Sequence, residues 1–472
     1  MPAIQRLFLL SLAVALGSCK PEILRVPRSS EEPSALRYNV TYVREPELEI
    51  DVEVVRGHNA PQDFRFTEEG VVSTVQAYTS TGQVRVLPVR DGGVRVPADA
   101  RFLRYRYSLS ARTGWRWRGL IEGMAHGDAL LISGKSWLLR PRVAEPLLKA
   151  ELSIQGADVL LPWQPGPDGV YRLRAEDLVD SGFHAFGGRR CQARLPDAVL
   201  DVAIQGPLTH LKDAQVCEWL LQRAEEVRKI RRSFPYPRVS VIVYPVPDQD
   251  DADIFGMVMW SSPPSIALLL GQDTRPGSFS EDWTALHELL HLTHPTILPR
   301  TPWVSEGLAT YFTELARARS GRFSPERAWQ ELLQGFDRGK RQARGRTMQQ
   351  MLDEDRPPGI YWVGAYFALR LDVALRKVTG NQRGLQDVLE LLATQGSTST
   401  VAGYGAAVDA VAGQPLFDAL LEAERRRPAF AGLEGLLEEL GVTPTPGGVK
   451  LQPARDSLVR EALDGKSAAG SR

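Results

Sequence analysis

Two histidines and a glutamate carry the clearest chemical signal in this sequence. His287 and His291 lie four residues apart within residues 283–291, and Glu288 follows the first histidine. On a helix, residues four apart differ by only about 40° in direction, so both imidazoles can reach one metal ion. Glu288 is turned away from the histidines and can accept a proton from a water molecule at that ion. The spacing therefore predicts a helical, zinc-dependent hydrolytic site.

A third metal ligand is expected in the segment Trp-Val-Ser-Glu-Gly-Leu-Ala-Thr-Tyr-Phe at residues 303–312. Its glutamate, Glu306, lies fifteen residues after His291. We expect a second helix over about 303–319 that turns Glu306 toward the histidines. The predicted cofactor is a zinc ion (Zn2+) held by His287, His291 and Glu306. Zinc lowers the pKa of a bound water to about 7, and Glu288 would then serve as the general base for that water.

His294 offers an alternative ligand, because it lies seven residues after His287 on nearly the same helical face. However, Pro295 disfavours helical geometry at the residue before it. If the ion moved to a site between His291 and His294, Glu288 would also lose its role as base. We expect His294 to lie beside the ligands or at the helix end.

The segment around Glu306 resembles the third-ligand segment of the gluzincin metallopeptidases, which include thermolysin and the zinc aminopeptidases. The sequence Tyr-Trp-Val-Gly at 361–364, with the helix that follows it, is more similar to the glycyl aminopeptidase family. That resemblance implies that Tyr361 donates a hydrogen bond to the oxyanion of the reaction. There are two alternatives. Tyr361 could instead be a core aromatic residue, or Tyr366 could take the role of hydrogen-bond donor to the oxyanion.

Several positions depart from the glycyl aminopeptidase pattern. Val363 stands where the family has lysine, the spacing from His291 to Glu306 is short, and no PDZ-like segment follows. Gly256 and Met257 occupy the place of the family's substrate-binding loop, without the carboxylate that holds a free amine. Both exopeptidase and endopeptidase action therefore remain open. Aspartates upstream of Gly256 could hold the free amine in place of the missing carboxylate. Residues 265–271 read as a strand, and the resembled fold has a substrate-pairing edge strand here.

The N-terminal residues predict a lipid anchor. Arg6 precedes the apolar stretch 7–16, and Leu-Gly-Ser-Cys at 16–19 is similar to a bacterial lipoprotein cleavage box. Ten mostly apolar residues are too few to span a bilayer. We expect cleavage before Cys19, lipidation of that residue, and attachment to the bacterial cell envelope. Lys20 is typical of default sorting to an outer membrane, facing the periplasm or the exterior. An ordinary signal peptide is the alternative.

Composition narrows the classes of partner. The chain has 57 basic and 57 acidic residues and no basic patch, which argues against nucleic-acid binding. The expected partners are a peptide or protein substrate and, through Cys19, a membrane; the residues give no signal for the oligomeric state. Apart from Cys19, the cysteines are Cys191 and Cys217, which could form a disulfide or remain buried thiols.

The pattern of apolar residues predicts an α+β protein: an N-terminal β-sandwich followed by a mostly helical, thermolysin-like zincin domain. Alternation typical of strands dominates to about residue 195, and helical patterns dominate from residue 213. The expected segments are a signal peptide at 1–19, a linker at 20–36, the β-sandwich at 37–200, the catalytic domain at 201–445 and a polar tail at 446–472. The helices are expected at 213–234, 326–336, 361–378, 384–394 and 415–440, in addition to the two metal helices.

The residues therefore favour a membrane-anchored zinc metallopeptidase, in which Glu288 activates a zinc-bound water for attack on a peptide bond. The alternative is a non-catalytic binding or scaffold lipoprotein of the envelope, whose zinc site is structural or vestigial. Chelation separates the two, since an enzyme loses activity when zinc is removed, whereas a scaffold binds its partner regardless of metal.

Overall fold

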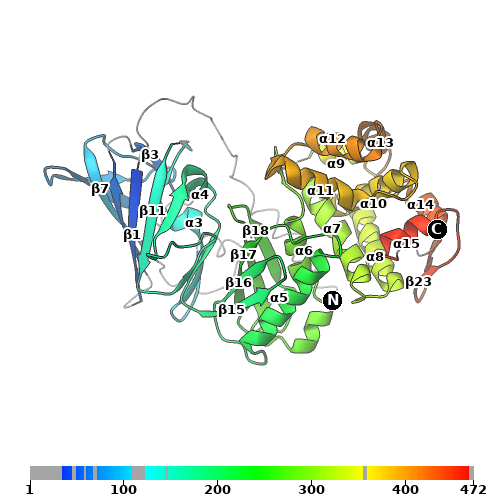
Figure 1. Cartoon of the computed structure of the whole chain (residues 1–472), viewed down its shortest axis with the longest axis horizontal. Helices are drawn as coiled ribbons and strands as arrows, with labels where there is room; N and C mark the ends of the chain where they lie inside the picture. The colour runs from blue at the N-terminus through cyan, green and yellow to red at the C-terminus, as the bar shows by residue number, and fades with distance from the viewer. Residues whose placement is uncertain are drawn as a thin grey trace. The chain divides into compact units, whose positions relative to one another are not determined.

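The structure is a computed structural model that describes residues 35–44, 49–57, 60–66, 72–108, 123–143, 147–354 and 359–466. The predicted signal segment and Cys19 lie outside these residues. The chain divides into two compact units (Figure 1). The first unit comprises Met1–Arg194, Val199–Glu218 and Arg238–Ser278, and the second comprises Leu195–Ala198, Trp219–Pro237 and Phe279–Arg472.

A seven-stranded sheet forms the largest layer of the first unit. Its strands, in spatial order, are β13 (Tyr171–Arg174), β11 (Lys149–Gln155), β1 (Ala35–Val43), β2 (Glu49–Arg56), β7 (Ala100–Ser108), β4 (Thr74–Thr79) and β5 (Val84–Pro88). Strand β1 alternates exposed and buried side chains along its length. This alternation places one face of the sheet against the core and leaves the other to solvent.

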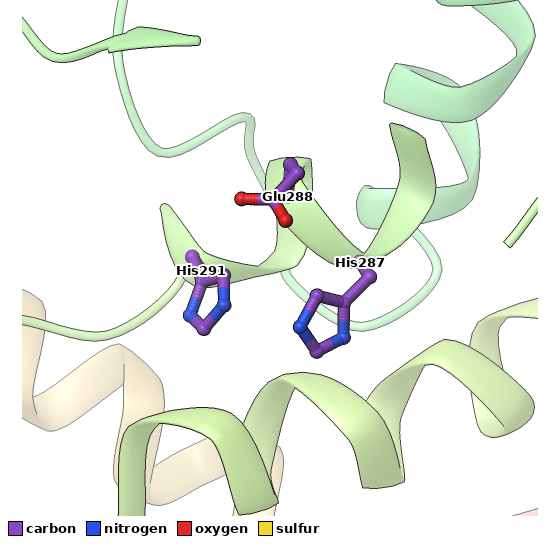
Figure 2. Close-up of side chains that lie close together, drawn as sticks. All are labelled: His287, Glu288 and His291. Atoms are coloured by element: carbon purple, nitrogen blue, oxygen red, sulfur yellow. The ribbon is translucent and has the colours of Figure 1, made fainter. Parts of the chain in front are cut away.

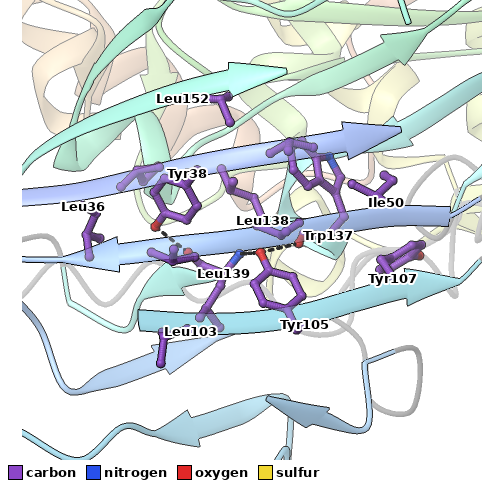
Figure 3. Close-up of a cluster of buried hydrophobic side chains, with 14 of the residues drawn as sticks. Leu36, Tyr38, Ile50, Leu103, Tyr105, Tyr107, Trp137, Leu138, Leu139 and Leu152 are labelled. Atoms are coloured by element: carbon purple, nitrogen blue, oxygen red, sulfur yellow. Dashed lines mark hydrogen bonds between the residues drawn. The ribbon is translucent and has the colours of Figure 1, made fainter. Parts of the chain in front are cut away.

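On the buried face of this sheet, two tyrosines form hydrogen bonds with the backbone of residues 137–139 (Figure 3). Tyr38 donates a hydrogen bond to the carbonyl oxygen of Leu139 at 2.7 Å, and Tyr105 donates to that of Trp137 at 3.0 Å. The Tyr105 hydroxyl also accepts from the Leu139 amide at 2.9 Å. Because buried backbone groups need partners, these bonds let a non-strand segment cross the core.

Two smaller sheets also belong to this unit. One contains β10 (Arg140–Pro141), β3 (Asp63–Arg65) and β6 (Gly93–Arg95), and the other contains β12 (Val159–Leu160), β14 (Phe183–Phe186), β9 (Ala129–Ser133) and β8 (Met124–His126). The second of these sheets shares an apolar core with the strands that follow it in the chain, through residues such as Leu131, Phe183 and Ile242.

A five-stranded mixed sheet follows, in the order β15 (Arg189–Arg194), β16 (Val199–Ile204), β17 (Arg238–Val246), β19 (Ser265–Gly271) and β18 (Phe255–Met259). The strand expected at 265–271 is present, but its expected edge position is wrong. It pairs with β17 on one side and β18 on the other, because every residue of β19 is buried and an edge would leave its backbone unpaired. The edge strands of this sheet are β18 and β15.

Cys191 and Cys217 form a disulfide with their Cα atoms 6.3 Å apart. This bond joins β15 to α5 (Asp213–Val227). Of the two states left open by the sequence, the structure therefore has the bridged one.

Helices dominate the second unit. They include α6 (Thr284–His291), α7 (Pro302–Arg319), α8 (Pro325–Ala343), α9 (Met348–Leu352), α10 (Ile360–Val378), α11 (Leu385–Gln395), α12 (Val401–Ala412), α13 (Phe417–Arg425), α14 (Leu433–Leu440) and α15 (Ser457–Leu463). The single pattern expected at 415–440 is two helices, because Pro428 interrupts it. Strands β22 (Val442–Thr445) and β23 (Gly448–Leu451) form a hairpin before α15.

The α+β prediction is confirmed, with an N-terminal β part and a helical C-terminal part. The domain limits given above stay a prediction. In the part of the chain that the structure describes, no helix is both long and apolar enough to cross a bilayer.

Candidate metal centre

Helix α6 presents both histidines on one side. The helix begins at Thr284 and ends at His291. Just before its start, Asp282 accepts a hydrogen bond from the Ala285 amide at 3.2 Å. Figure 2 shows the two imidazoles pointing the same way from α6, while Glu288 points in another direction. A nitrogen of each imidazole and a carboxylate oxygen of Glu288 lie within 4.8 Å of one another, and all three residues are buried.

Glu306 of α7 faces the two imidazoles. Its Oε2 atom lies 3.3 Å from Nε2 of His287 and 3.3 Å from Nε2 of His291. A tetrahedral zinc ion bonded to nitrogen and oxygen at about 2.0 to 2.1 Å would separate those atoms by about 3.3 Å. Two imidazoles and one carboxylate are also the ligand set of a catalytic zinc site with an open fourth position. The residues therefore fit a zinc ion in both chemistry and spacing.

The charges of the cluster fit a cation as well. Burial lowers the pKa of His287 to about 4, so this imidazole is neutral, as a metal ligand must be. Burial opposes ionisation of Glu306, but the two histidines outweigh it and hold the pKa of this carboxyl below its ordinary range. Burial also lowers the pKa of His291, yet Glu306 and Glu288 outweigh it and raise the pKa overall. Two carboxylates thus concentrate negative charge around His291, which a divalent cation would neutralise.

Trp283 holds the ring of His287 by stacking. The ring centroids lie 4.1 Å apart at an interplanar angle of 21°. Trp283 in turn donates a hydrogen bond from Nε1 to Glu314 at 3.0 Å, and Glu314 pairs with Arg317 at 3.3 Å. Nδ1 of His287 has no hydrogen-bond partner among the described residues. No role for Trp283 was predicted from the sequence, although its spacing of four residues from His287 places both on one helical face.

Helices α7 and α10 pack closely against each other (Figure 1). A Cβ atom added to Gly307 would lie 2.5 Å from the backbone of Gly364, and one added to Gly364 would overlap the carbonyl oxygen of Trp303. Only glycines allow two helix backbones to approach this closely. Glu306 precedes one of these glycines by one residue, and Tyr361 precedes the other by three. Both side chains therefore start within one turn of the crossing.

The two tyrosines proposed for the oxyanion differ in their surroundings. Tyr361 is half-buried in the first turn of α10. Tyr366 is buried among Phe336 and Phe430, with ring centroids at 5.9 and 5.2 Å, and burial raises its pKa to about 12. This packing favours a core role for Tyr366, and the role of Tyr361 stays a prediction.

His294 is buried beside the cluster. Its ring centroid lies 5.7 Å from that of His291, and its Nδ1 hydrogen-bonds with the carbonyl oxygen of Pro295 at 3.0 Å. Burial lowers its pKa to about 4. Gly256 and Met257 lie on β18, an edge strand of the five-stranded sheet, where Met257 is half-buried and pairs with Ala267. They belong to the first compact unit, so their predicted part in substrate binding stays a prediction.

Comparison with known proteins shows the fold. No family model and no curated protein matches the chain. Among solved structures, it is similar to an aminopeptidase N family protein from Idiomarina loihiensis, with a TM-score of 0.65 and 16% identity over 86% of this chain and 78% of the other. It also matches a native yeast LTA4 hydrolase with a TM-score of 0.49 and 11% identity, over 90% and 70% of the two chains. The chain therefore shares its fold with an aminopeptidase N family protein.

Proposed function

We propose that this chain is a zinc-dependent peptidase. The observation that carries the proposal is the placement of Oε2 of Glu306 at 3.3 Å from both Nε2 atoms of His287 and His291. The similarity of the fold to an aminopeptidase N family protein supports it. When bound, zinc would supply Lewis acidity, which makes a peptide carbonyl more electrophilic and a neighbouring water more acidic.

The protein's own groups would then move the proton. The carboxylate of Glu288 takes a proton from the attacking water as the new bond forms between water oxygen and carbonyl carbon. Glu288 next gives that proton to the amine nitrogen as the carbon–nitrogen bond breaks. The products are a carboxylic acid and an amine, and no oxidant or reductant is required.

Tyr361 is the proposed donor to the oxyanion that forms on the carbonyl oxygen. Its place within one turn of the α7–α10 crossing supports this role. A hydroxyl held there would be aimed at charge that exists only in the transition state. We propose Gly256 and Met257 as backbone contacts for an extended substrate, because β18 is an edge strand of its sheet among the described residues.

We further propose that the chain is a lipoprotein of the bacterial envelope, anchored through Cys19. Residues 6–19 supply the sequence pattern, and the Cys191–Cys217 disulfide supports folding in an oxidising compartment. The intact mass of the mature protein tests this proposal. Cleavage before Cys19 with added acyl mass supports it, and a mature chain that starts elsewhere contradicts it.

Metal removal tests the enzymatic proposal. We expect the purified protein to cleave members of a mixed peptide library, to stop after treatment with a chelator, and to recover when zinc is added back. The positions of the cut bonds would separate removal of terminal residues from internal cleavage. Cleavage that persists without metal would contradict the proposal. Binding of a partner without any cleavage would instead favour the scaffold function.

A further inference from the structure

A polar cavity lies at the C-terminal ends of α7 and α10. It has a volume of about 450 Å³, which is within the range of small-ligand sites. Arg319 contributes from the last turn of α7, and Arg376 from the last turn of α10. Lys229 and Lys466 complete the cationic lining, and no carboxylate lines the cavity.

The two arginines of this cavity are held in place by their surroundings. Arg376 is only 3% exposed, and its guanidinium donates to Asp372 at 3.0 Å, Asn381 at 3.3 Å and Gln386 at 3.0 Å. Arg319 donates from Nε to the carbonyl oxygen of Leu463 at 2.9 Å and from Nη1 to that of Lys229 at 3.3 Å. Both guanidinium groups are therefore positioned before any ligand arrives.

Two glycines bring the backbone against these arginines. A Cβ atom on Gly465, whose φ is +82°, would lie 2.6 Å from Cγ of Arg319. A Cβ atom on Gly384 would lie 2.7 Å from Cζ of Arg376. The positive φ of Gly465 lets the chain turn over Arg319 after α15. The local backbone is thus shaped to pack against the cationic side chains.

Nearby carboxylates offset only part of the positive charge of the cavity. Among the described residues, no carboxylate lies within 4.0 Å of Arg319, Lys229 or Lys466, and the two lysine side chains make no hydrogen bond. The carbonyls that Arg319 contacts carry only partial charges. Burial lowers the pKa of Arg319, which reflects the cost of keeping its charge in this position. Asp372 pairs with Arg376, and Asp464 acts on Arg319 and Lys466 from a longer distance. Two carboxylates therefore face four cationic side chains, and a net excess of positive charge remains.

We propose that this cavity binds a phosphate-bearing anion with at least two negative charges. Arginine forks match the spacing of phosphate oxygens, and lysine adds a mobile point charge. A phosphate group has enough acceptor oxygens for several cations at once, whereas a carboxylate has two. The polar lining and open mouth suit a charged ligand rather than an apolar one. This proposal is independent of the peptidase proposal, since its readout is anion binding.

Calorimetric titration of the full chain with inorganic pyrophosphate tests the site. The double variant Lys229→Ala/Lys466→Ala removes two exposed charges that make no ion pair within 4.0 Å among the described residues, so we expect it to fold. Lys212→Ala/Lys450→Ala is the matched control, because it removes two exposed charges elsewhere. We expect one site in the wild type, weakening of about tenfold or more in the pocket variant and no change in the control. Affinity should also fall as salt is raised.

Three outcomes would overturn the proposal. They are no pyrophosphate binding at millimolar concentration, equal binding in the two double variants, and citrate binding as tight as pyrophosphate. Vesicles with and without phosphatidic acid identify the source of the phosphate. Sedimentation that depends on phosphatidic acid and is lost in the pocket variant would indicate a lipid phosphate. Soluble binding without that dependence would indicate a soluble one.

Discussion

In the proposed metal centre, the second ring nitrogen of His287, Nδ1, has no hydrogen-bond partner among the described residues, and Trp283 stacks on the ring instead. In most zinc sites that nitrogen donates to a carboxylate or carbonyl, which fixes the ring. Here the indole of Trp283 stacks on the imidazole, and Glu314 anchors the indole. We therefore assign Trp283 the task of orienting His287.

Replacing Trp283 tests this assignment. Trp283→Leu removes both the stacking surface and the indole donor, and we expect zinc affinity to fall by about tenfold or more. Trp283→Phe keeps a ring that can stack, and we expect a smaller loss. Zinc competition with a chelating dye measures both, and thermal unfolding of the metal-free proteins controls for lost stability. Wild-type zinc affinity in Trp283→Leu would rule out the assignment.

Zinc affinity should depend on pH through His291. Since the pKa of His291 is raised above 6.5 in the metal-free protein, zinc must displace a proton from it at lower pH. We expect constant affinity above this pKa and a fall of about tenfold per pH unit below it. His287, with a pKa of about 4, adds a second proton only in stronger acid. Dye competition between about pH 8 and about pH 5 measures how zinc affinity changes with pH. An affinity that does not change with pH would contradict the assignment of His291 as a zinc ligand.

At this scale, most residues of the proposed metal centre were predictable from the sequence. Spacing alone brings His287 and His291 to one face, and the structure places Glu306 against both. The role of Trp283 was not predicted, because a tryptophan four residues before a histidine far more often only packs in the core. The cationic cavity could not be predicted from the sequence, because only tertiary packing brings its residues together. These residues are Lys229, Arg319, Arg376 and Lys466.

At the scale of elements, the crossing of α7 and α10 decides where Glu306 and the start of α10 meet. Gly307 and Gly364 form its contact. The two glycines are far apart in the chain, so no local pattern could pair them. The same limit applies to the five-stranded sheet, where the order of β17, β19 and β18 depends on long-range pairing. Helix existence was easier to predict, because the 3.6-residue period is local.

A single methyl group tests the crossing. Gly364→Ala would place Cβ against the Trp303 carbonyl, and we expect it to lower the free energy of unfolding by about 1 to 3 kcal/mol and to weaken zinc binding by displacing Glu306. Gly435→Ala is the matched control, because a Cβ atom there meets nothing within 4 Å. We expect it to stabilise the protein by up to about 1 kcal/mol. Denaturant unfolding gives both values, and equal stability of the two variants would exclude a tight crossing.

At the scale of the whole molecule, the second compact unit holds two clusters of opposite chemistry, the proposed metal centre and the proposed anion site. The metal centre collects carboxylates and imidazoles near the start of α7, whereas the cavity at the end of α7 collects arginines and lysines. The broad α+β class was predictable from the change in periodicity along the chain. The division into units was less so, because the first unit also takes in Val199–Glu218 and Arg238–Ser278.

The central claim is that Glu288 works with a zinc ion to hydrolyse peptide bonds, and one comparison tests it most directly. Zinc content and peptide cleavage should be measured together for the wild type, Glu288→Gln and the control Glu326→Gln, which alters an exposed carboxylate in α8. We predict stoichiometric zinc in all three proteins and a fall in kcat of about 10²- to 10⁴-fold in Glu288→Gln alone. Wild-type cleavage by zinc-loaded Glu288→Gln would contradict the account.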